Sequence, residues 1–491
     1  MPGVVVTTGA VAGPSAPTIA PASTYFAVGL AERGATDEAV LVQSFAQFEA
    51  AFGGRTTYSA LYEDLKMFFE EGGTRAYVGR VVGAAATKGV LTGGLKDRTS
   101  SSPPATLNVT ARSAGAWSSK VKVQVLDGAT TGTFRIRVYL TDAGGTDRLM
   151  KDYTNLHSPQ EAVSRMSSDP YIVVTDAGSA SSAPTNNPVA VGPVALGAGT
   201  DDRAAVVAAD YIAALTRFEV GLGDGAVAIP GIGSSVHAGL LAHASAYNRL
   251  ALLVEDRDAD IDTLLDTASQ IDDKRGGLFA PWVMVPDTFG GSKTISPEGF
   301  VAAARSRAHN AAGPWQAAAG ENSKARYVVA PDTVFSADQG NDLDAGKVNA
   351  IRTVAGAVRL YGWRSLSADE DNWAYLTGAD TINRVVTEAY RQLEPYLFGT
   401  IDAKGHLLAR VAGTLEGIVL PMADAGGLFA RFDPLTGDQL DPGYKVNVGS
   451  DINPVGSLAL NQVIAELGIR VAPTAAIVLL TVTKAAVTAA L

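Results

Sequence analysis

The residues of this chain that come nearest to a nucleotide-binding motif are the glycines of one short turn. Gly221, Gly223 and Ala226 fit the pattern G-x-G-x-x-A. In a dinucleotide-binding fold this loop opens a helix, so that backbone N–H groups face the pyrophosphate. Here the turn leads into VAIPG, which is strand-like, and the chain has no G-x-x-x-x-G-K-[ST] phosphate loop. A glycine turn between two elements is the favoured interpretation, and a nucleotide-binding enzyme using the turn at 221–226 is the unfavoured alternative.

A second candidate for chemistry is the acidic run EDRDADID. Asp256, Asp258, Asp260 and Asp262 alternate as they do in the first half of a calcium-binding loop. Such a loop also needs a glycine and a bidentate glutamate. Ile261 and Thr267 stand at those two positions. We therefore expect a solvated acidic turn after a strand.

The histidines do not form a catalytic or metal-binding pattern. His237 and His243 are six residues apart, whereas two ligands on one helix face are spaced i, i+4. Ser234 and Ser235 precede His237, but the G-x-S-x-G nucleophile elbow is missing. We expect both histidines on a helix surface or satisfied within a core. The sequence thus predicts no catalytic residue, no metal ligand and no cofactor.

The composition of the chain favours assembly over solution chemistry. Of 491 residues, 47% are hydrophobic and only 18% are charged, against about 25% charged in typical domains. This deficit suggests that much of the surface is buried against other copies of the chain. The net charge of −11, with no basic run, argues against nucleic-acid binding. The chain has no cysteine, so it has no disulfides.

Two patterns of hydrophobic residues divide the chain. Strands and helices alternate over residues 24–82 and again from about residue 200, which indicates an α/β layer. Ser44 and Gln47 have the spacing of a helix capping box. Between residues 91 and 196, runs such as SSKVKVQVLDG alternate polar and apolar residues with period two, as antiparallel strands do. The fold class we predict is α/β (α+β) and multidomain, with an inserted antiparallel β-rich domain.

The predicted domain boundaries follow these patterns. We expect a strand and linker arm over 1–22, an outer α/β domain over 23–90 and 200–340, the β-rich insertion over 91–199, and an inner domain over 341–491. The inner domain should contain an amphipathic helix that packs it through one apolar stripe. The residues of this stripe are Ile382, Val385, Val386, Ala389, Tyr390, Leu393 and Leu397.

The first 22 residues have an unusual composition. Val4, Val5 and Val6 form a short apolar run, and residues 9–22 are an uncharged stretch rich in Gly, Ala and Pro. At roughly 3.1 Å per residue, such a linker reaches about 40 Å. The arm has no features of a signal peptide. Three valines are unusual in a tail that stays solvated, so we expect Val4–Val6 to form a strand; a disordered tail is the alternative.

Several segments, taken in order, resemble the contractile tail sheath proteins of bacteriophages and of related contractile injection systems. They are PGVVV, FAVGLAERGATDEAVLVQSFAQFEAAFGG, FFEEGGTRAYVGRVV, ARSAGAWSSKVKVQV, GGLFAPWVMVPD, AIRTVAGAVRLYGWRSLSADEDNWAYL, INPVG and GIRVAPTAAIVLL. Each motif is degenerate, and the shared order over nearly the whole chain makes the resemblance specific. The match departs from the family pattern at SPEGFVAAARSRAHNAAGPWQAAAGE and in the extra C-terminal tail TKAAVTAAL.

The resemblance implies a structural protein and not an enzyme. Its subunits would stack as hexameric rings around a tail tube, then contract and drive the tube through the host envelope for genome delivery. A sheath of a phage-derived injection system without a genome is the alternative. The implied partners are other copies of the chain, the tube protein, and the baseplate and terminator proteins, with no nucleic acid and no membrane insertion. The implied location is a virion tail assembled in the host cytoplasm.

The resemblance also assigns residues to this assembly. The N-terminal strand Val4, Val5 and Val6 would pair with a neighbouring subunit. A C-terminal strand would pair either within the inner sheet or between subunits. Its residues are Ile477, Val478, Leu479, Leu480, Thr481 and Val482. The polar side of the inner helix, with Arg384, Glu388 and Arg391, is expected either to face the tube or to form a solvated surface.

Overall fold

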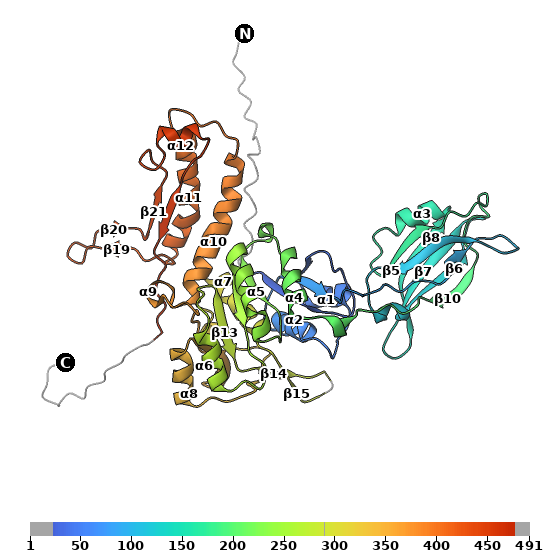
Figure 1. Ribbon diagram of the computed structural model, residues 1–491, viewed down its shortest axis with the longest axis horizontal. Helices are drawn as coiled ribbons and strands as arrows, with labels where there is room; N and C mark the ends of the chain where they lie inside the picture. Colours follow the sequence, from blue (N-terminus) through green and yellow to red (C-terminus); the bar gives the residue numbers. More distant parts are fainter. Residues whose placement is uncertain (1–22, 289, 477–491) are drawn as a thin grey trace, which may run out of the picture.

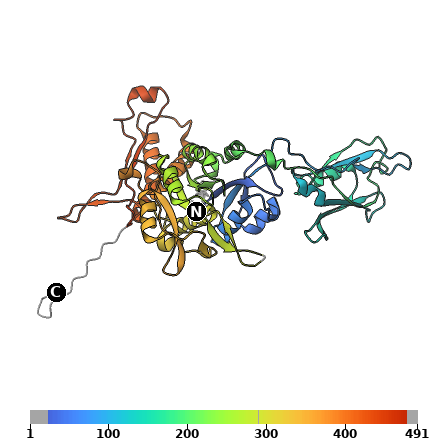
Figure 2. The same cartoon turned by 60° about the horizontal axis from the view of Figure 1, so that its bottom comes forward.

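The computed structural model describes residues 23–288 and 290–476. The chain forms an α/β body with a β-rich insertion extending from one end and a C-terminal helical unit at the other, as Figures 1 and 2 show. This arrangement confirms the predicted multidomain α/β fold class. The predicted terminal strands at 4–6 and 477–482 lie outside the described residues.

The body is built on one eight-stranded sheet. Six neighbouring strands run parallel, while an edge strand at each side pairs antiparallel with its neighbour. In spatial order the strands are β18 (Ala357–Leu360), β17 (Val348–Val354), β13 (Gly276–Ala280), β12 (Arg249–Leu253), β11 (Gly225–Ala228), β1 (Tyr25–Leu30), β3 (Ala76–Val81) and β2 (Val40–Val42). The central parallel strands are almost wholly buried, as expected when helices cover both faces.

Helices cover the sheet on both sides and create two cores. Alternate residues of β1 point to opposite faces, so Tyr25 and Ala27 join one core while Phe26 and Val28 join the other. The first core includes residues of α1 (Phe45–Phe52), α2 (Leu61–Glu70) and α7 (Glu298–Ala311). The second includes residues of α4 (Ala208–Ala214), α5 (His237–Tyr247), α6 (Ile261–Ser269) and α8 (Ala337–Ala345). A small antiparallel sheet of β14 (Val283–Pro286), β15 (Ser292–Ile295) and β16 (Ala330–Pro331) lies beside the body.

Local sequence signals account for the start and end of α1. The Ser44 hydroxyl accepts a hydrogen bond from the backbone N–H of Gln47 at 3.2 Å, and the Gln47 side chain accepts one from the N–H of Gln43 at 2.8 Å. The helix ends at Gly53, whose φ of +91° suits glycine. Ser44 is therefore confirmed as the cap, while the second bond of the predicted capping box goes to Gln43, one residue before the cap, and not to Ser44.

The insertion has a hydrophobic core of its own, which extends from Leu91 to Leu196. Two antiparallel sheets enclose it. One consists of β4 (Leu95–Lys96), β5 (Ala105–Ala111) and β9 (Ile172–Asp176); the other consists of β10 (Val191–Ala195), β6 (Val121–Asp127), β7 (Phe134–Thr141) and β8 (Asp147–Leu156). Helix α3 (Pro159–Arg165) packs beside β9.

The C-terminal unit begins later than the sequence predicts. Strands β17 and β18 extend the large sheet of the body, so the predicted boundary between residues 340 and 341 is wrong. The unit itself contains α10 (Leu376–Leu393), α11 (His406–Asp424), β19 (Arg431–Phe432), β20 (Gln439–Asp441), β21 (Tyr444–Asn447), α12 (Val455–Ala459) and β22 (Glu466–Ile469), and the short α9 (Glu370–Trp373) precedes it. Short 3-10 helices occur at Ala116–Lys120, Arg203–Ala205, Leu215–Arg217, Val220–Leu222, Ser234–Val236, Gly320–Ser323 and Glu394–Tyr396.

Candidate assembly surface

The C-terminal unit contains a two-stranded sheet whose outer edges have no third strand among the described residues. β21 and β22 pair antiparallel, from Tyr444 opposite Ile469 to Asn447 opposite Glu466. One face of this sheet packs against α11, where Val446 and Leu467 join a small core around Val419. The opposite face, with Glu466 and Gly468, is exposed. The strands alternate polar and apolar residues because only one face of the sheet is covered by a helix, while the other face is exposed to solvent.

Both outer edges of this sheet lack a further strand among the described residues. A sheet of two strands is marginally stable in water, and three or more strands are normally needed. Unpaired edges also offer rows of backbone N–H and C=O groups that can accept another chain. β21 is absent from the predicted elements, although the alternation of Tyr444 and Val446 is its signal.

Exposed apolar side chains are concentrated in the same unit. Of 23 large apolar side chains that are exposed in the described part of the chain, 12 lie between residues 386 and 464. They are Val386, Tyr390, Leu397, Phe398, Leu420, Phe429, Phe432, Leu435, Leu440, Val455, Leu460 and Ile464. Such a density of exposed apolar groups is typical of an interaction surface.

Helix α10 packs differently from the prediction. Val385, Ala389 and Leu393 of the apolar stripe do contact the core around α11, but Val386 and Tyr390 are 40% and 58% exposed. The helix connects two units, and its polar side faces the α/β body. Only part of the apolar stripe therefore packs against the C-terminal unit. Its other part, with Val386 and Tyr390, is exposed on the surface of the subunit.

The expected tube-facing or solvated role is wrong for two of its three residues. Arg384 and Glu388 are buried, and the Arg384 guanidinium lies 3.2 Å from Asp224 and 3.0 Å from Glu388. These contacts attach α10 to the loop before β11, because a buried charge requires an opposite charge nearby. Arg391 is partly exposed, and its Nη1 atom is buried without a hydrogen-bond partner among the described residues.

The glycine turn lacks the geometry of a nucleotide site. Residues Val220–Leu222 form a 3-10 turn, and the chain then enters strand β11 at Gly225. The predicted turn between two elements is confirmed. No helix begins at this loop, so its backbone N–H groups are not arranged around a phosphate.

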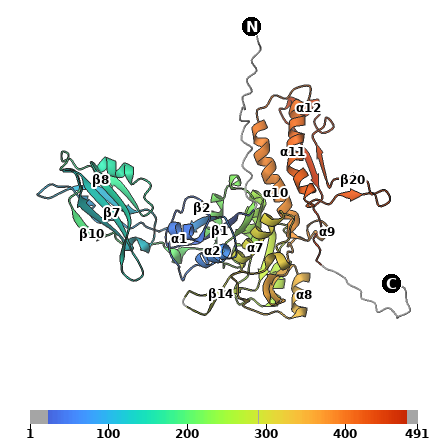
Figure 3. The same cartoon turned by 180° about the vertical axis from the view of Figure 1, so that it is seen from behind.

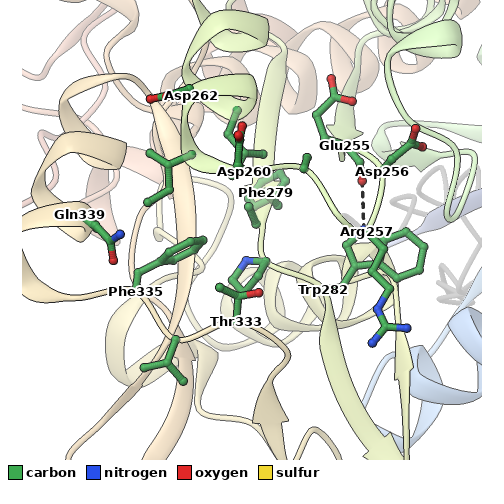
Figure 4. Close-up of a pocket in the computed structure, with 16 residues that line it drawn as sticks. Glu255, Asp256, Arg257, Asp260, Asp262, Phe279, Trp282, Thr333, Phe335 and Gln339 are labelled. Carbon is green, nitrogen blue, oxygen red and sulfur yellow. Dashed lines mark hydrogen bonds between the residues drawn. The ribbon is translucent and has the colours of Figure 1, made fainter.

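A pocket of about 490 Å³ lies where ligands commonly bind in α/β sheets, at the carboxyl ends of β12 and β13. Figure 4 shows Asp256, Asp260 and Asp262 on the side of the pocket opposite Phe335. The Arg257 guanidinium is held by Asp332 at 3.0 Å. The acidic lining repels phosphate groups, which counts against the nucleotide-binding alternative.

The remaining polar candidates have structural roles. Asp260 caps α6 by accepting a hydrogen bond from the Thr263 N–H at 2.9 Å, as expected for a turn. His237 is buried and lies 2.8 Å from the Val254 carbonyl oxygen; His243 lies 2.7 Å from the Arg249 guanidinium. The prediction of satisfied core histidines is confirmed. Within residues 23–288 and 290–476, no cluster of three metal-ligating side chains occurs, and no helix has the length and apolar character to cross a membrane.

Comparisons of the sequence alone find no relatives. No protein-family model matches the chain. A search of curated proteins finds no match either.

Comparison of the structure finds sheath proteins. A sheath tail protein of Listeria innocua matches with a TM-score of 0.62 at 14% identity, over 88% of this chain and 89% of that one. A sheath tail protein of Desulfitobacterium hafniense gives 0.57 at 13% identity, over 90% and 93%. The contracted helical sheath of the anti-feeding prophage gives 0.56 at 15% identity, over 99% of each chain. The chain thus has the fold of contractile sheath proteins, which confirms the resemblance predicted from its sequence.

Proposed function

We propose that this chain is the structural subunit of a contractile sheath and that it works by polymerising with copies of itself. The sheet of β21 and β22 supports this proposal most directly, because both of its edges are unpaired in the described chain. The fold adds support, since solved sheath proteins match nearly its whole length. The solved neighbours are sheath components, and we propose no catalytic activity for the chain.

Strand exchange is the proposed means of polymerisation. Val4, Val5 and Val6 of one neighbour and the segment 477–482 of another would each add a strand to the sheet of β21 and β22. The sheet would then have four strands, and its free backbone groups would be hydrogen-bonded. The uncharged linker at 9–22 crosses between subunits without burying charges. These connections would keep neighbouring subunits attached while the folded bodies move.

In this proposal the subunits form stacked hexameric rings around an inner tube, between a baseplate and a terminator. The sheath is assembled in an extended state and shortens when triggered, which drives the tube through a cell envelope. The free energy comes from new contacts between subunits, so no nucleotide is consumed. The acidic pocket and the glycine turn fit this proposal, since neither offers a phosphate site.

Two kinds of particle use such a sheath. One is a phage tail that delivers a genome from a virion, and the other is an injection particle without a genome. The phage tail is our proposal, and the injection particle is the alternative. The match to the anti-feeding prophage sheath over 99% of both chains supports this alternative. Particles purified from the source bacterium distinguish them, because only the phage contains packaged DNA.

Electron microscopy of the purified full-length chain tests the proposed function. We expect rings or long tubes in negative stain. Deletion of residues 1–21 should abolish polymerisation and leave the circular dichroism spectrum unchanged, since these residues precede the body. Val5→Asp should have the same effect, because burying a charged carboxylate in a strand interface costs desolvation free energy.

Val207→Asp is the matched control, since Val207 is an apolar side chain of the body that is 60% exposed. This variant should assemble normally. A full-length chain that stays monomeric at all concentrations and salt conditions would contradict the proposed function.

A further inference from the structure

A two-stranded hairpin projects from the C-terminal unit and pairs only through two residues of each strand. β19 and β20 pair through Arg431 with Asp441 and through Phe432 with Gln439. We call residues 429–441 the finger. Figures 1 and 3 show the finger pointing away from the α/β body, on the side of α11 that faces β21.

The base of the finger is anchored to the sheet of β21 and β22. The backbone N–H of Phe429 donates to the Arg470 carbonyl oxygen at 2.7 Å, and the N–H of Arg470 donates to the Gly443 carbonyl oxygen at 2.7 Å. The Arg470 guanidinium donates to the Phe429 carbonyl oxygen at 3.0 Å and to Asp441 at 2.9 Å. The finger therefore has a fixed direction, although its two strands alone would be marginal.

The finger carries a large apolar surface. Phe429, Phe432 and Leu440 are 50%, 58% and 57% exposed, and Leu435 in the turn is 94% exposed. Four large apolar side chains on a two-stranded hairpin are costly in water. Together they require an apolar surface that the described chain does not give them.

A second set of exposed apolar side chains lies on α10 and just beyond its end. We call Val386 and Tyr390 of α10, together with Leu397 and Phe398 shortly after its end, the outer face of α10; they are 40%, 58%, 66% and 106% exposed. Phe398 has a φ of +63°, an uncommon conformation for a bulky residue. Strained and exposed residues of this kind cluster at binding sites.

The positions of the two surfaces identify the partner. In Figures 1 and 3, α11 lies between the finger and α10. One chain cannot bring its own finger to its own outer face without unfolding the unit. A contact between two different surfaces of the same chain is head-to-tail, and such a contact repeats into a ring or a helix. A second copy of this chain is therefore the partner.

The charged groups beside these surfaces are complementary. The turn of the finger carries Asp433 and Asp438, and Asp438 forms no ion pair with any described residue. Next to Tyr390, Arg391 also lacks an ion pair within the described ranges, and its Nη1 is buried without a hydrogen-bond partner. Arg391 is partly exposed, so a carboxylate of the finger can approach its charge from outside the subunit.

We propose that the finger of one subunit docks on the outer face of α10 of the next subunit, with Leu435 beside Tyr390 and Asp438 beside Arg391. This inference rests on the proposed sheath function. It assigns Arg391 to a contact between subunits in place of the expected contact with the tube. The interface is separate from the strand exchange, because it uses neither arm.

Disulfide cross-linking tests the contact cleanly, since the chain contains no cysteine. Leu435→Cys and Tyr390→Cys are purified separately, mixed, assembled and oxidised. We expect a covalent dimer that forms only when both proteins are present. Val334→Cys is the matched control, because Val334 is 82% exposed on the body. Its mixture with Leu435→Cys should give no dimer.

Two results would overturn the inference while leaving the sheath function intact. One is a normal tube with no cross-link between positions 435 and 390. The other is a cross-link from Tyr390→Cys to Val5→Cys, which would show that an arm covers the outer face of α10. Failure of the unmodified chain to assemble would instead remove the proposed function.

A charge exchange gives an independent test that needs no oxidation. Asp438→Arg and Arg391→Asp should each raise the protein concentration needed for assembly by at least tenfold. Combined in one chain, the two changes should restore assembly, because they recreate the pair with reversed charges. A double variant that assembles no better than either single variant would contradict the pairing.

Discussion

At the scale of single residues, the body contains a pair of carboxyl groups that burial makes sensitive to pH. Asp64 on α2 and Glu298 on α7 are each 1% exposed. The Tyr25 hydroxyl donates to Asp64 at 2.9 Å, and the Gly231 N–H donates to Glu298 at 2.9 Å. Burial raises the pKa of Glu298 to about 7, and burial together with the nearby Glu298 raises the pKa of Asp64 well above its ordinary value.

These raised pKa values predict that the free energy of unfolding falls as the pH rises. The folded state keeps protons that the unfolded state releases above about pH 4.5, so stability is lost between about pH 4.5 and 7. For Glu298 alone the loss is roughly 3 kcal/mol. Glu298→Gln cannot ionise and still accepts from Gly231. We expect this variant to be more stable than the natural chain at pH 8 and to have a weaker pH dependence in urea unfolding.

The exposed Glu38 provides the matched control, and Glu38→Gln should leave the pH profile unchanged. Equal slopes for Glu298→Gln and the natural chain would contradict the role of this carboxyl group.

Single residues were predictable from sequence only where their role is local. The cap of α1 depends on residues three positions apart, and Asp260 depends on Thr263 in the same turn. Glu71 shows the contrary case. Its carboxylate is fully buried and accepts hydrogen bonds from the backbone N–H groups of residues 326–328. Residues more than 250 positions away make that site, and no pattern around Glu71 indicates them.

At the scale of elements, α10 is attached to the body through a buried ion pair. Arg305 of α7 and Asp380 of α10 are almost completely buried, and the guanidinium approaches the carboxylate at 2.7 and 3.0 Å. His309 lies 3.4 Å from the same carboxylate. Burial alone would raise the pKa of Asp380, but Arg305 and His309 hold it below its ordinary value. The ionised pair therefore joins two elements that lie 75 residues apart.

Breaking this pair should detach α10 from the body. Asp380→Asn removes the carboxylate charge that faces the buried Arg305, and we expect a loss of about 3–5 kcal/mol in the free energy of unfolding. Replacing both residues with apolar ones, Arg305→Met with Asp380→Leu, should recover most of this loss. Urea unfolding measures both effects, and hydrogen exchange should show faster opening in α10 for Asp380→Asn.

The exposed Glu394 at the end of α10 offers a control, since Glu394→Gln should change neither measurement. A double apolar variant less stable than Asp380→Asn would show that the pair itself is net stabilising.

The amphipathic pattern predicted α10 as a helix but not which of its faces is covered. In a chain that folds alone, an apolar stripe faces the core. In a chain that assembles, part of the stripe can face a neighbour, and Val386 and Tyr390 are the exposed part of this stripe. Likewise β17 and β18 have the pattern of strands, but pattern alone does not say that they extend the sheet of the body.

At the scale of the whole molecule, the insertion is joined to the body by a narrow connection. Thr87 and Thr200 exchange two backbone hydrogen bonds, at 2.8 and 3.1 Å, so the chain leaves and returns at one place. Buried Arg80 spans the joint by donating to the carbonyl oxygens of Ala31 at 3.1 Å and Ala114 at 2.9 Å. Burial lowers the pKa of this guanidinium to about 10, although Tyr58, Asp201 and Glu32 act in the opposite direction.

The insertion should therefore be removable without loss of assembly. Its core is separate from the two cores of the body, and Figures 1 and 3 place it far from the C-terminal unit. Residues 88–199 would be replaced by Gly-Ser, because two residues suffice to turn an antiparallel pair. In this variant Arg80 loses the Ala114 carbonyl oxygen as an acceptor. Water can take its place, because removal of the insertion exposes the guanidinium. We expect a folded body, and tubes of smaller outer diameter in electron micrographs.

The matched control carries the same Gly-Ser pair inserted after Thr87 and keeps residues 88–199. It separates an effect of the new turn from an effect of the deletion. Tubes from both proteins would place the contacts that hold the sheath in the body, the arms and the C-terminal unit. If the deletion variant folds, as judged by a cooperative urea transition, but forms no tubes, the insertion must supply contacts between subunits, and the interface would extend beyond the strand exchange and the finger.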